Sequence, residues 1–411
     1  MVNKIITTLE ISSSSIKCVS GYLLNDKPII LNSEITPLED GCMKGGMIND
    51  YGVVTKAVSQ IITRASEKLK FPIQEVVLIV PSIGFEVYRN SQTTNVVSPI
   101  GQINKIDIDN VKSQVSKAKV NEGSIIVDIL PERYIFHDGE SVEPPYGQMS
   151  DSLTIDAKLH AIPTIILNSF KKIISQCGLR ICRIVVSIFA ACGMIKNLGN
   201  LPKNYVLVDL GSEINSAALI GGNEPFSPMY SMFGSDQITR TLSDELNIDF
   251  LSAQYLKEKI GIDTRKTSYK TLLLKVTSSN KKEVSNIEFN EKMIEISTNY
   301  IQNISRIVDE IFQKNPACVG FPVVFVGGGS KLYGFEQLAK SLNKFNNSLF
   351  ITPTALGARD ARFTNCVGAL CIYGESIKSR VGGIIEDDYT EYESTINRRI
   401  KLQRGDIDQE D

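Results

Sequence analysis

The stretch YVLVDLGSEINSAALIGG, residues 205–222, decides the fold of this chain. An apolar run ends in Asp209, a turn with glycine follows, and a second apolar run returns, which predicts a β-hairpin. A weaker twin, KIITTLEISSSSIKCVSGYL over residues 4–24, has Glu10 in place of Asp209 and a serine turn in place of Gly-Ser-Glu. These two units predict two related lobes facing one cleft; two unrelated hairpins are the alternative. Phosphate held by the backbone N–H groups of two turns suits such a cleft.

The composition is that of a globular protein with room for several domains: 411 residues, 42% hydrophobic, with a net charge of −2. This charge leaves no electrostatic footprint for nucleic acid. The two histidines, His137 and His160, argue against a histidine-based metal site or a Ser-His-Asp triad. The eight cysteines show no Cys-x-x-Cys spacing, so we expect buried thiols in a reducing cytoplasm. We expect neither a signal peptide nor a transmembrane helix.

Apolar periodicity predicts the main elements between and beyond the two hairpins. Residues 53–69 and 289–312 have helical spacing, and residues 76–80 form a short buried strand. Residues 83–161 alternate short strand-like segments with one helix, which predicts an inserted α+β subdomain. A strand over 323–326 runs into three glycines, a turn at which a base or phosphate can approach the backbone closely.

This set of features resembles the actin-like ATPase superfamily, and within it the chain resembles the FtsA family of bacterial cell-division proteins. The loop GCMKGGMIND, residues 41–50, is similar to that family's glycine–Lys-Gly-Gly–Asn-Asp loop. The segment HDGESVEPPYGQMSD, followed by AKLHAI, resembles its Gly–Pro–Gly-Met–His segment. The matching positions there are Gly139, Pro145, Gly147, Met149 and His160.

The resemblance implies an α/β, bilobal actin-like (duplicated ribonuclease-H-like) fold with inserted 1C and 2B subdomains. Subdomain 1C is peculiar to FtsA and replaces a subdomain of actin. The implied order is 1A over 1–82, 1C over 83–162, 1A over 163–200, 2A over 201–233, 2B over 234–318, 2A over 319–365, a return to 1A over 366–385, and a charged, disordered tail over 386–411.

The resemblance also implies a nucleotide site for ATP or ADP with Mg²⁺, in which Asp209 faces the metal through water. The first phosphate loop, the second phosphate loop, the ribose helix and the adenine turn supply its residues. These are Glu10, Ser12, Ser13, Ser14, Lys17, Asp209, Gly211, Ser212, Gly234, Gln254, Lys257, Gly327, Gly328, Gly329 and Lys331.

Several positions depart from the family pattern. Ser12 stands where the first loop has glycine, residues 211–216 read Gly-Ser-Glu-Ile-Asn-Ser instead of Gly-Gly-Gly-Thr-x-Asp, and Gln254 replaces an acid. A side chain in place of glycine costs about 1 kcal/mol if the backbone needs positive φ. A Glu213 carboxylate at ~4 Å from a polyphosphate adds roughly 1–4 kcal/mol of repulsion. We therefore expect weak or absent ATP binding, and the pocket holding ATP, ADP or no nucleotide stays open.

Hydrolysis is expected to be negligible, so no catalytic residue is assigned. Actin-like enzymes place Gln or Glu before the second hairpin to orient the attacking water. That place is taken here by Ser187, and Ser216 replaces the acid of the second loop.

The resemblance further implies partners. FtsA binds the C-terminal peptide of FtsZ through subdomain 2B, where Lys292, Ser297 and Arg306 are the candidate pocket residues, with Ser297 in place of the family's arginine. Family members polymerise head to tail, to which an edge around residues 85–95 is a candidate contact. FtsA also ends in an amphipathic membrane helix, for which residues 394–403 are a short candidate, flanked by acids. Its apolar and basic residues are Ile396, Arg398, Arg399, Ile400 and Lys401.

Three functions follow from these features. The first is an FtsA-like scaffold, peripheral at the cytoplasmic face of the membrane at the division site, that links FtsZ filaments to the membrane or to other divisome partners. The second is an active actin-like ATPase forming nucleotide-dependent filaments. The third is a PilM-like pilus-assembly adaptor with a different peptide partner. The loop over 41–50 and the Pro–Gly–Met–His segment favour the first over the third.

Overall fold

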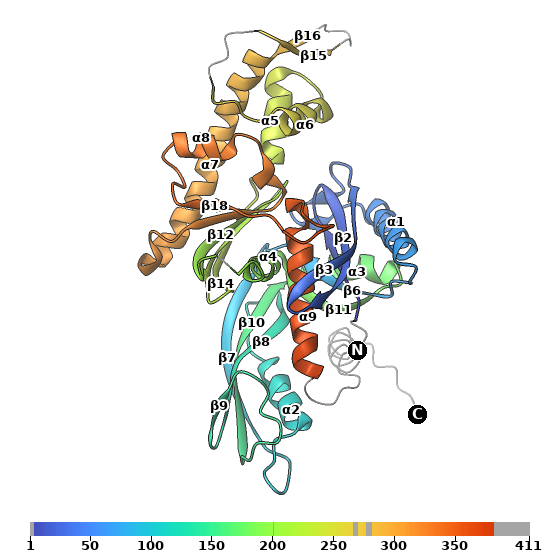
Figure 1. The fold of residues 1–411 in the computed structure, drawn as a ribbon, viewed down its shortest axis with the longest axis vertical. Helices are drawn as coiled ribbons and strands as arrows, with labels where there is room; N and C mark the ends of the chain where they lie inside the picture. The colour runs from blue at the N-terminus through green and yellow to red at the C-terminus, as the bar shows by residue number, and fades with distance from the viewer. Residues whose placement is uncertain (1–3, 200, 266–269, 277–281, 382–411) are drawn as a thin grey trace.

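The chain forms two α/β lobes, each carrying a further subdomain, so that the molecule is elongated (Figure 1). The computed structural model describes residues 4–199, 201–265, 270–276 and 282–381. The tail predicted over 386–411, with the candidate membrane segment, lies outside the described residues.

The first lobe is built on a five-stranded sheet in the order β11-β6-β1-β2-β3. Strand β1 pairs antiparallel with β2 and parallel with β6, so the first predicted hairpin feeds directly into the centre of the sheet. Both β1 and β6 are almost entirely buried, as expected of strands covered on both faces. The strand bounds are β1 Ile6–Ile11, β2 Ser15–Leu24, β3 Lys27–Pro37, β6 Glu75–Val80 and β11 Arg180–Val186.

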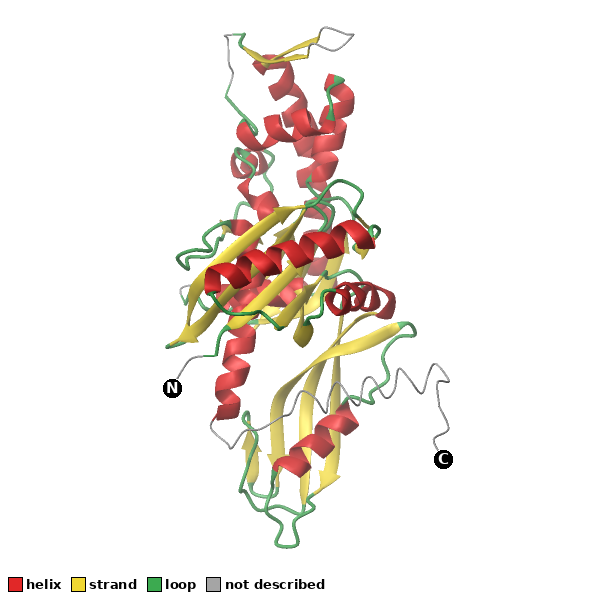
Figure 2. Cartoon of the chain, turned by 90° about the vertical axis from the view of Figure 1, so that its right-hand side faces the viewer, coloured by secondary structure: helices red, strands yellow, loops and turns green. Residues whose placement is uncertain are grey.

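Helices cover the faces of this sheet (Figure 2). Helix α1 begins at Tyr51 because Asp50 Oδ1 accepts a hydrogen bond from the Val53 N–H at 2.9 Å. A small hairpin, β4 with β5, forms the glycine loop that precedes it. The bounds are α1 Tyr51–Leu69, α3 Thr164–Gln176, α4 Ser187–Lys196, α9 Thr364–Val381, β4 Met43–Lys44 and β5 Met47–Ile48.

The second lobe repeats this arrangement around residues 205–222. Its sheet has the order β14-β13-β12-β17-β18, in which β12 pairs antiparallel with β13 and parallel with β17. The same sequence of antiparallel and parallel pairings therefore occurs in both lobes, which confirms the predicted duplication. The bounds are β12 Asn204–Leu210, β13 Asn215–Gly221, β14 Glu224–Ser231, β17 Val323–Val326, β18 Ser348–Phe350 and α8 Phe335–Ser341, with the 3₁₀ turns η1 Pro316–Cys318, η2 Gly328–Lys331 and η3 Ala361–Phe363.

A helical subdomain extends the second lobe. Its long helix, α7, begins at Asn286, three residues before the expected start, because Ser285 caps it by accepting a hydrogen bond from the Glu288 N–H. The apolar side chains spaced along α7 are buried, as their helical periodicity predicts. The bounds are α5 Asp236–Leu246, α6 Phe250–Lys259, β15 Leu272–Val276, β16 Lys282–Ser285 and α7 Asn286–Lys314.

A separate four-stranded sheet, order β7-β10-β8-β9, extends the first lobe and carries one helix on its face (Figure 2). It has its own apolar core, which includes Tyr134, Leu153 and Val111. Asn104 and Asp107 form a capping box that starts its helix, α2. The bounds are β7 Glu86–Asn95, α2 Lys105–Val115, β8 Ser124–Phe136, β9 Gly139–Ser141 and β10 Ser152–Pro163.

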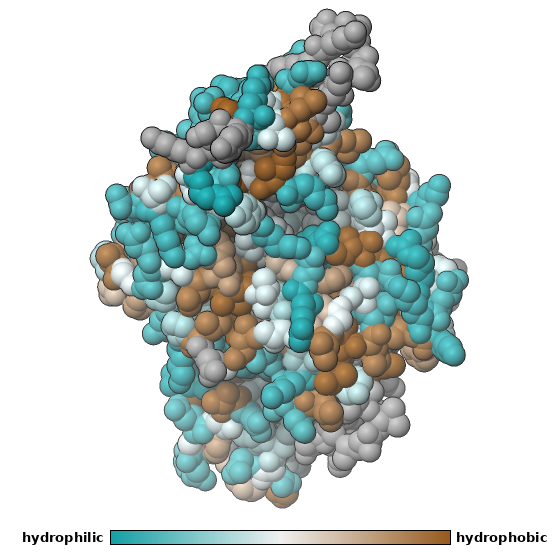
Figure 3. Space-filling view, turned by 45° about the horizontal axis from the view of Figure 1, so that its top comes forward, coloured by the Kyte–Doolittle hydropathy of each residue, from teal (hydrophilic) through white to brown (hydrophobic). Residues whose placement is uncertain are grey.

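The surface face in Figure 3 shows hydrophobic residues in several separate groups, divided by hydrophilic ones. In the part of the chain that the structure describes, no helix has both the length and the apolar character needed to cross a membrane.

Candidate functional site

A cavity of about 440 Å³ lies where the two hairpin turns, the three-glycine turn and the start of α9 come together. Of the residues predicted to bind nucleotide, all but one line it. They are Glu10, Ser12, Ser13, Ser14, Lys17, Asp209, Gly211, Ser212, Gln254, Lys257, Gly327, Gly328, Gly329 and Lys331.

Gly234 is the predicted residue that does not line the cavity. It lies against the second turn, where a Cβ atom would stand 2.2 Å from the Ser212 carbonyl oxygen. Its N–H donates to the Glu213 carbonyl at 2.9 Å. Gly234 therefore supports the turn that faces the cavity and does not itself face a ligand.

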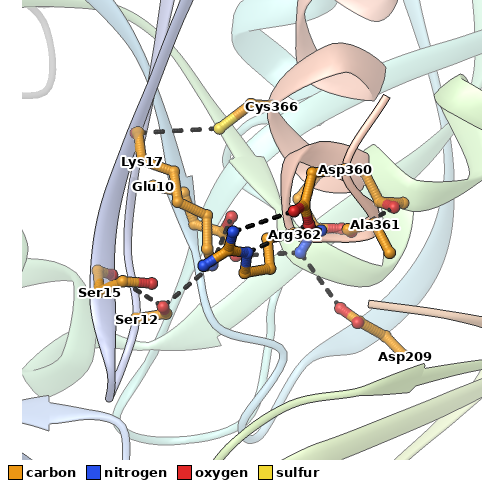
Figure 4. A network of polar contacts seen from close by, with 11 residues as sticks. Glu10, Ser12, Ser15, Lys17, Asp209, Asp360, Ala361, Arg362 and Cys366 are labelled. Carbon is orange, nitrogen blue, oxygen red and sulfur yellow. Dashed lines mark hydrogen bonds and ion pairs between the residues drawn. The ribbon is translucent and has the colours of Figure 1, made fainter. Parts of the chain in front are cut away.

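Three cations of the cavity already have acceptors within the chain. Lys17 Nζ lies 3.1 Å from Glu10 Oε2 and 3.0 Å from Ser12 Oγ, as Figure 4 shows. Lys257 Nζ donates to the Ser235 carbonyl at 3.1 Å, and its burial lowers the pKa of Lys257. Lys331 Nζ lies 2.9 Å from Asp360 Oδ2. A polyphosphate bound here would compete with these acceptors for the cations.

Arg362, which was not predicted from the sequence, also lines the cavity, and Figure 4 shows it beside Asp360, the partner of Lys331. The guanidinium of Arg362 donates to both oxygens of Asp360, at 3.1 and 2.9 Å. Partial burial acts to raise the pKa of Asp360, but hydrogen bonds from Arg362 and Lys331 outweigh it and hold that pKa well below its usual range. The cavity beside Arg362 is therefore cationic but internally paired.

The floor of the cavity joins both lobes through Asn365, at the start of α9. Asn365 Nδ2 donates to Glu10 Oε1 at 3.0 Å and to Asp209 Oδ2 at 3.1 Å. Burial, and next the nearby Glu10 carboxylate, raise the pKa of Asp209 to about 6. Asn365 was not predicted from the sequence, where the available signal was a polar residue just before an apolar run at the start of this helix.

We expect Asp209→Asn to stabilise the protein at alkaline pH. A folded-state pKa of about 6 lies above the unfolded value, so the ionised carboxylate costs stability above pH 6 and this cost disappears as the pH falls. The rise of the Asp209 pKa to about 6 corresponds to at most about 3 kcal/mol of stability. The amide oxygen introduced by the substitution can still accept a hydrogen bond from Asn365. Urea unfolding at pH 8 and pH 5 measures the difference.

Asp360→Asn is the matched control for that experiment, because its pKa is displaced in the opposite direction. This variant should lose stability at pH 8. A gain from Asp209→Asn that is larger at pH 5 than at pH 8 would contradict the expected pKa of Asp209.

Glu213 does not oppose the phosphates as expected from the sequence. Its Oε1 accepts a hydrogen bond from the Gly45 N–H at 2.9 Å, across the cleft in the glycine loop of the first lobe. The expected repulsion of a polyphosphate by Glu213 is therefore wrong in its geometry. The backbone penalty is wrong as well, because Ser12, Ser212 and Glu213 are not among the described residues with positive φ.

Ser187 and Ser216 both line the cavity. Ser187 is the first residue of α4, and its Oγ lies 2.7 Å from Ser82 Oγ, which also accepts from the Ile188 N–H. His160 lies apart from the cavity, between the rings of Phe85 and Phe189. Burial lowers the pKa of His160 to about 3 and keeps its ring neutral.

A second, smaller groove lies between α5 and α7. Phe233, Ile238 and Ile296 form its apolar lining, and Glu245 and Glu295 stand at its rim. Lys292 lies 2.6 Å from Glu245 and 3.2 Å from Glu295, so both rim acids share one cation.

None of the three predicted peptide-pocket residues lines this groove, although Lys292 contacts its two acids. Ser297 is fully buried inside the subdomain. Arg306 is ten residues beyond Ile296 on α7, which is about 15 Å along the helix axis. All three predicted residues lie on one helix, α7, as expected, but the sequence does not indicate which face of α7 packs against α5.

No family model matches the sequence. The cell division protein FtsA of Streptococcus pneumoniae serotype 2 (strain D39 / NCTC 7466) is 24% identical over 366 residues, which cover 88% of this chain and 78% of that protein. FtsA of Bacillus subtilis (strain 168) is 23% identical over 378 residues, covering 90% of this chain and 83% of that protein. The chain is similar to FtsA proteins over most of its length.

Solved structures similar to this FtsA-like chain share its architecture. The PilM-PilN type IV pilus biogenesis complex matches with a TM-score of 0.60 at 16% identity, covering 90% of this chain and 98% of that one. MreB5 of Spiroplasma citri bound to ADP matches with a TM-score of 0.53 at 11% identity, covering 93% of this chain and 99% of that one. The MamK double helical filament matches with a TM-score of 0.51 at 12% identity, covering 90% of this chain and 99% of that one. These likenesses confirm the actin-like α/β fold and establish nothing beyond the fold.

Proposed function

We propose that this FtsA-like chain is a cell-division scaffold that links FtsZ filaments to the cytoplasmic membrane or to other divisome partners, and that it binds ATP weakly or not at all. The observation that carries the second part is the internal pairing of three lysines that line the cavity. Each of these ammonium groups donates a hydrogen bond to an oxygen atom within the protein; the three residues are Lys17, Lys257 and Lys331. Similarity to FtsA over most of the sequence supports the first part.

Negligible ATP turnover is part of the same proposal. An attacking water needs a base at hydrogen-bond distance, and Ser187, at the position proposed for that role, is paired with another serine. The floor carboxylates Glu10 and Asp209 both accept from Asn365. We expect ATP affinity to be weaker than micromolar. Sub-micromolar affinity measured by calorimetry, together with turnover above roughly 1 per second, would favour the active ATPase instead.

The peptide of FtsZ is proposed to bind in the groove between α5 and α7. Apolar and polar lining residues side by side are the usual composition of a peptide site. The acids Glu245 and Glu295 already pair with Lys292, so the apolar residues of the lining are proposed to hold the peptide. Arg306 is not part of this proposal, because it lies outside the groove.

A pulldown with the C-terminal peptide of FtsZ from the same organism, with and without ATP-Mg, tests the scaffold proposal. We expect equal capture under both conditions, because the groove and the nucleotide cavity share no lining residue. Absence of capture in both would overturn FtsZ binding.

The groove itself is tested by Asn299→Arg. Asn299 is an exposed residue of the groove lining, and a long side chain there would obstruct the peptide. We expect at least about a tenfold loss of peptide affinity in fluorescence anisotropy, which is about 1.4 kcal/mol. Arg306→Ala, on the same helix but outside the groove, is the control and should bind as the parent does. Equal affinity of the two variants would exclude the groove.

Head-to-tail self-association is proposed through β7. This strand is the edge of its sheet, and alternate side chains along it are exposed, so its outer N–H and C=O groups can meet another chain.

Membrane attachment is proposed through residues 394–403, outside the described part of the chain. Co-sedimentation with liposomes of the full chain against a chain ending at Gly383 tests it, and equal pelleting would exclude the tail.

A further inference from the structure

The residues at the cavity floor do not match what a divalent cation requires. Magnesium in proteins is held by carboxylate oxygens and by waters that carboxylates orient. Here Glu10 and Asp209 are the two acids in that place, and one amide group, Asn365 Nδ2, donates to both of them. Among the described residues, no group of three or more His, Cys, Asp or Glu side chains is arranged to hold a metal ion.

The Asn365 amide is held in this orientation. Both of its neighbours at Nδ2 are carboxylates, which only accept hydrogen bonds when ionised, so the amide cannot turn its oxygen toward them. Asn365 is 6% exposed, and its Oδ1 has no hydrogen-bond partner among the described residues. The amide keeps this arrangement although it leaves an acceptor unsatisfied, which shows that the two acids determine its position.

The remaining oxygens at the floor are also engaged or enclosed. Glu10 Oε2 lies 3.1 Å from Lys17 Nζ, so both oxygens of Glu10 have internal donors. Asp209 Oδ1 lies against Gly327, where even a Cβ atom would come within 2.2 Å of it. Lys17 therefore offsets one of the two carboxylate charges, and the neutral Asn365 amide fills the position between the two acids as a hydrogen-bond donor.

We propose that Asn365 takes the place of a divalent cation at the floor of the cleft, so that a nucleotide held there is bound without Mg²⁺. The second clause, that nucleotide binds without Mg²⁺, rests on the weak nucleotide binding proposed above. The first clause, on Asn365, does not depend on it. That first clause concerns the free protein: Glu10, Asn365 and Asp209 connect the two lobes without a metal. The predicted role of Asp209, facing Mg²⁺ through water, is replaced in this proposal by a direct hydrogen bond to Asn365.

The first experiment measures Mn²⁺ binding to the full chain by electron paramagnetic resonance, with no nucleotide present. We expect no Mn²⁺ site at the floor of the parent protein. Asn365→Asp removes the donor and adds a third carboxylate, and we expect it to bind Mn²⁺ at least about tenfold more tightly than the parent. Asn346→Asp makes the same change at an exposed position outside the cavity lining and should gain nothing. Tight Mn²⁺ binding by the parent that Asp209→Asn abolishes would overturn the proposal.

The second experiment needs no variant and measures ADP binding by calorimetry in MgCl₂ and in EDTA. Equal affinity in both supports Mg²⁺-independent binding, and an affinity at least about tenfold higher with Mg²⁺ overturns it. If the parent binds no ADP in either buffer, the clause on nucleotide binding is overturned and the Mn²⁺ measurement decides the clause on Asn365. The FtsZ-peptide pulldown is independent of both, so its failure removes the scaffold proposal and leaves this one standing.

Discussion

Replacing Gly327 with alanine is expected to lower the free energy of unfolding by about 3 kcal/mol, from backbone strain and overpacking together. Gly327 has φ +85°, a conformation that side-chain-bearing residues adopt at a cost. A Cβ atom there would stand 2.2 Å from Asp209 Oδ1 and 2.8 Å from the Leu210 carbonyl oxygen. The methyl group would therefore push apart the strand end and the acid that form the cavity floor. Chemical denaturation with circular dichroism measures the loss.

Gly320→Ala separates the two contributions, because Gly320 has a similar φ of +91° but no atom within 4 Å of where its Cβ would lie. This control should lose only the backbone cost, about 1 kcal/mol. If both variants lose the same amount, the close approach of Gly327 to Asp209 carries no energetic weight and the proposed geometry of the floor is wrong.

Replacing Lys158 with methionine is expected to cost about 2–4 kcal/mol. The Lys158 side chain is only 6% exposed and lies 2.9 Å from Glu132 Oε1, with Glu224 as a second partner. Its ammonium also lies 4.5 Å from the centre of the Phe226 ring. Glu132 belongs to β8 and Glu224 to β14, so this lysine fastens the four-stranded sheet to the second lobe. Removing its charge leaves Glu224 without this partner and Glu132 with Arg89, whose Nε lies 3.6 Å from Glu132 Oε2.

Lys292→Met is the matched control, since Lys292 also bridges two glutamates, Glu245 and Glu295, but at a solvent-exposed site. Its loss should be much smaller, because solvent screens exposed ion pairs. Adding Glu224→Gln to Lys158→Met should recover part of the stability by removing the charge that lost this partner. Equal losses for the two single variants, measured in the same urea series, would show that burial of Lys158 does not matter.

Local pattern was sufficient to predict the main elements of this protein. The hairpin over 205–222, its twin over 4–24 and the long helix α7 were predicted because alternation, glycine turns and helical spacing are properties of neighbouring residues. The boundaries moved by a few residues where a cap decided them, as Ser285 does for α7. The predicted phosphate loops and the three-glycine turn meet at one cavity, since each follows a strand that ends there.

The chemistry of the cavity was not predictable from the sequence in the same way. Asn365 lies 355 positions from Glu10 and 156 from Asp209, and Glu213 lies 168 from Gly45. Glu213 was predicted to face the phosphates because it stands in the second phosphate loop. Its hydrogen-bond donor is instead the Gly45 N–H of the first lobe. The same holds for Ser297, whose place on α7 was correct and whose burial depends on what packs against that helix.

The sequence by itself determined that this chain has two related lobes, where their turns lie, and which family its motifs resemble. The tertiary structure decided which of those residues are available to a ligand. The physical reason is that secondary structure follows from the spacing of residues close together in the chain, whereas a lysine is free or paired, and an acid is exposed or bridged, according to neighbours brought from distant positions by packing. Asn365 shows the difference most directly, because nothing beside it in the sequence indicates that it would join the two acids of the cleft.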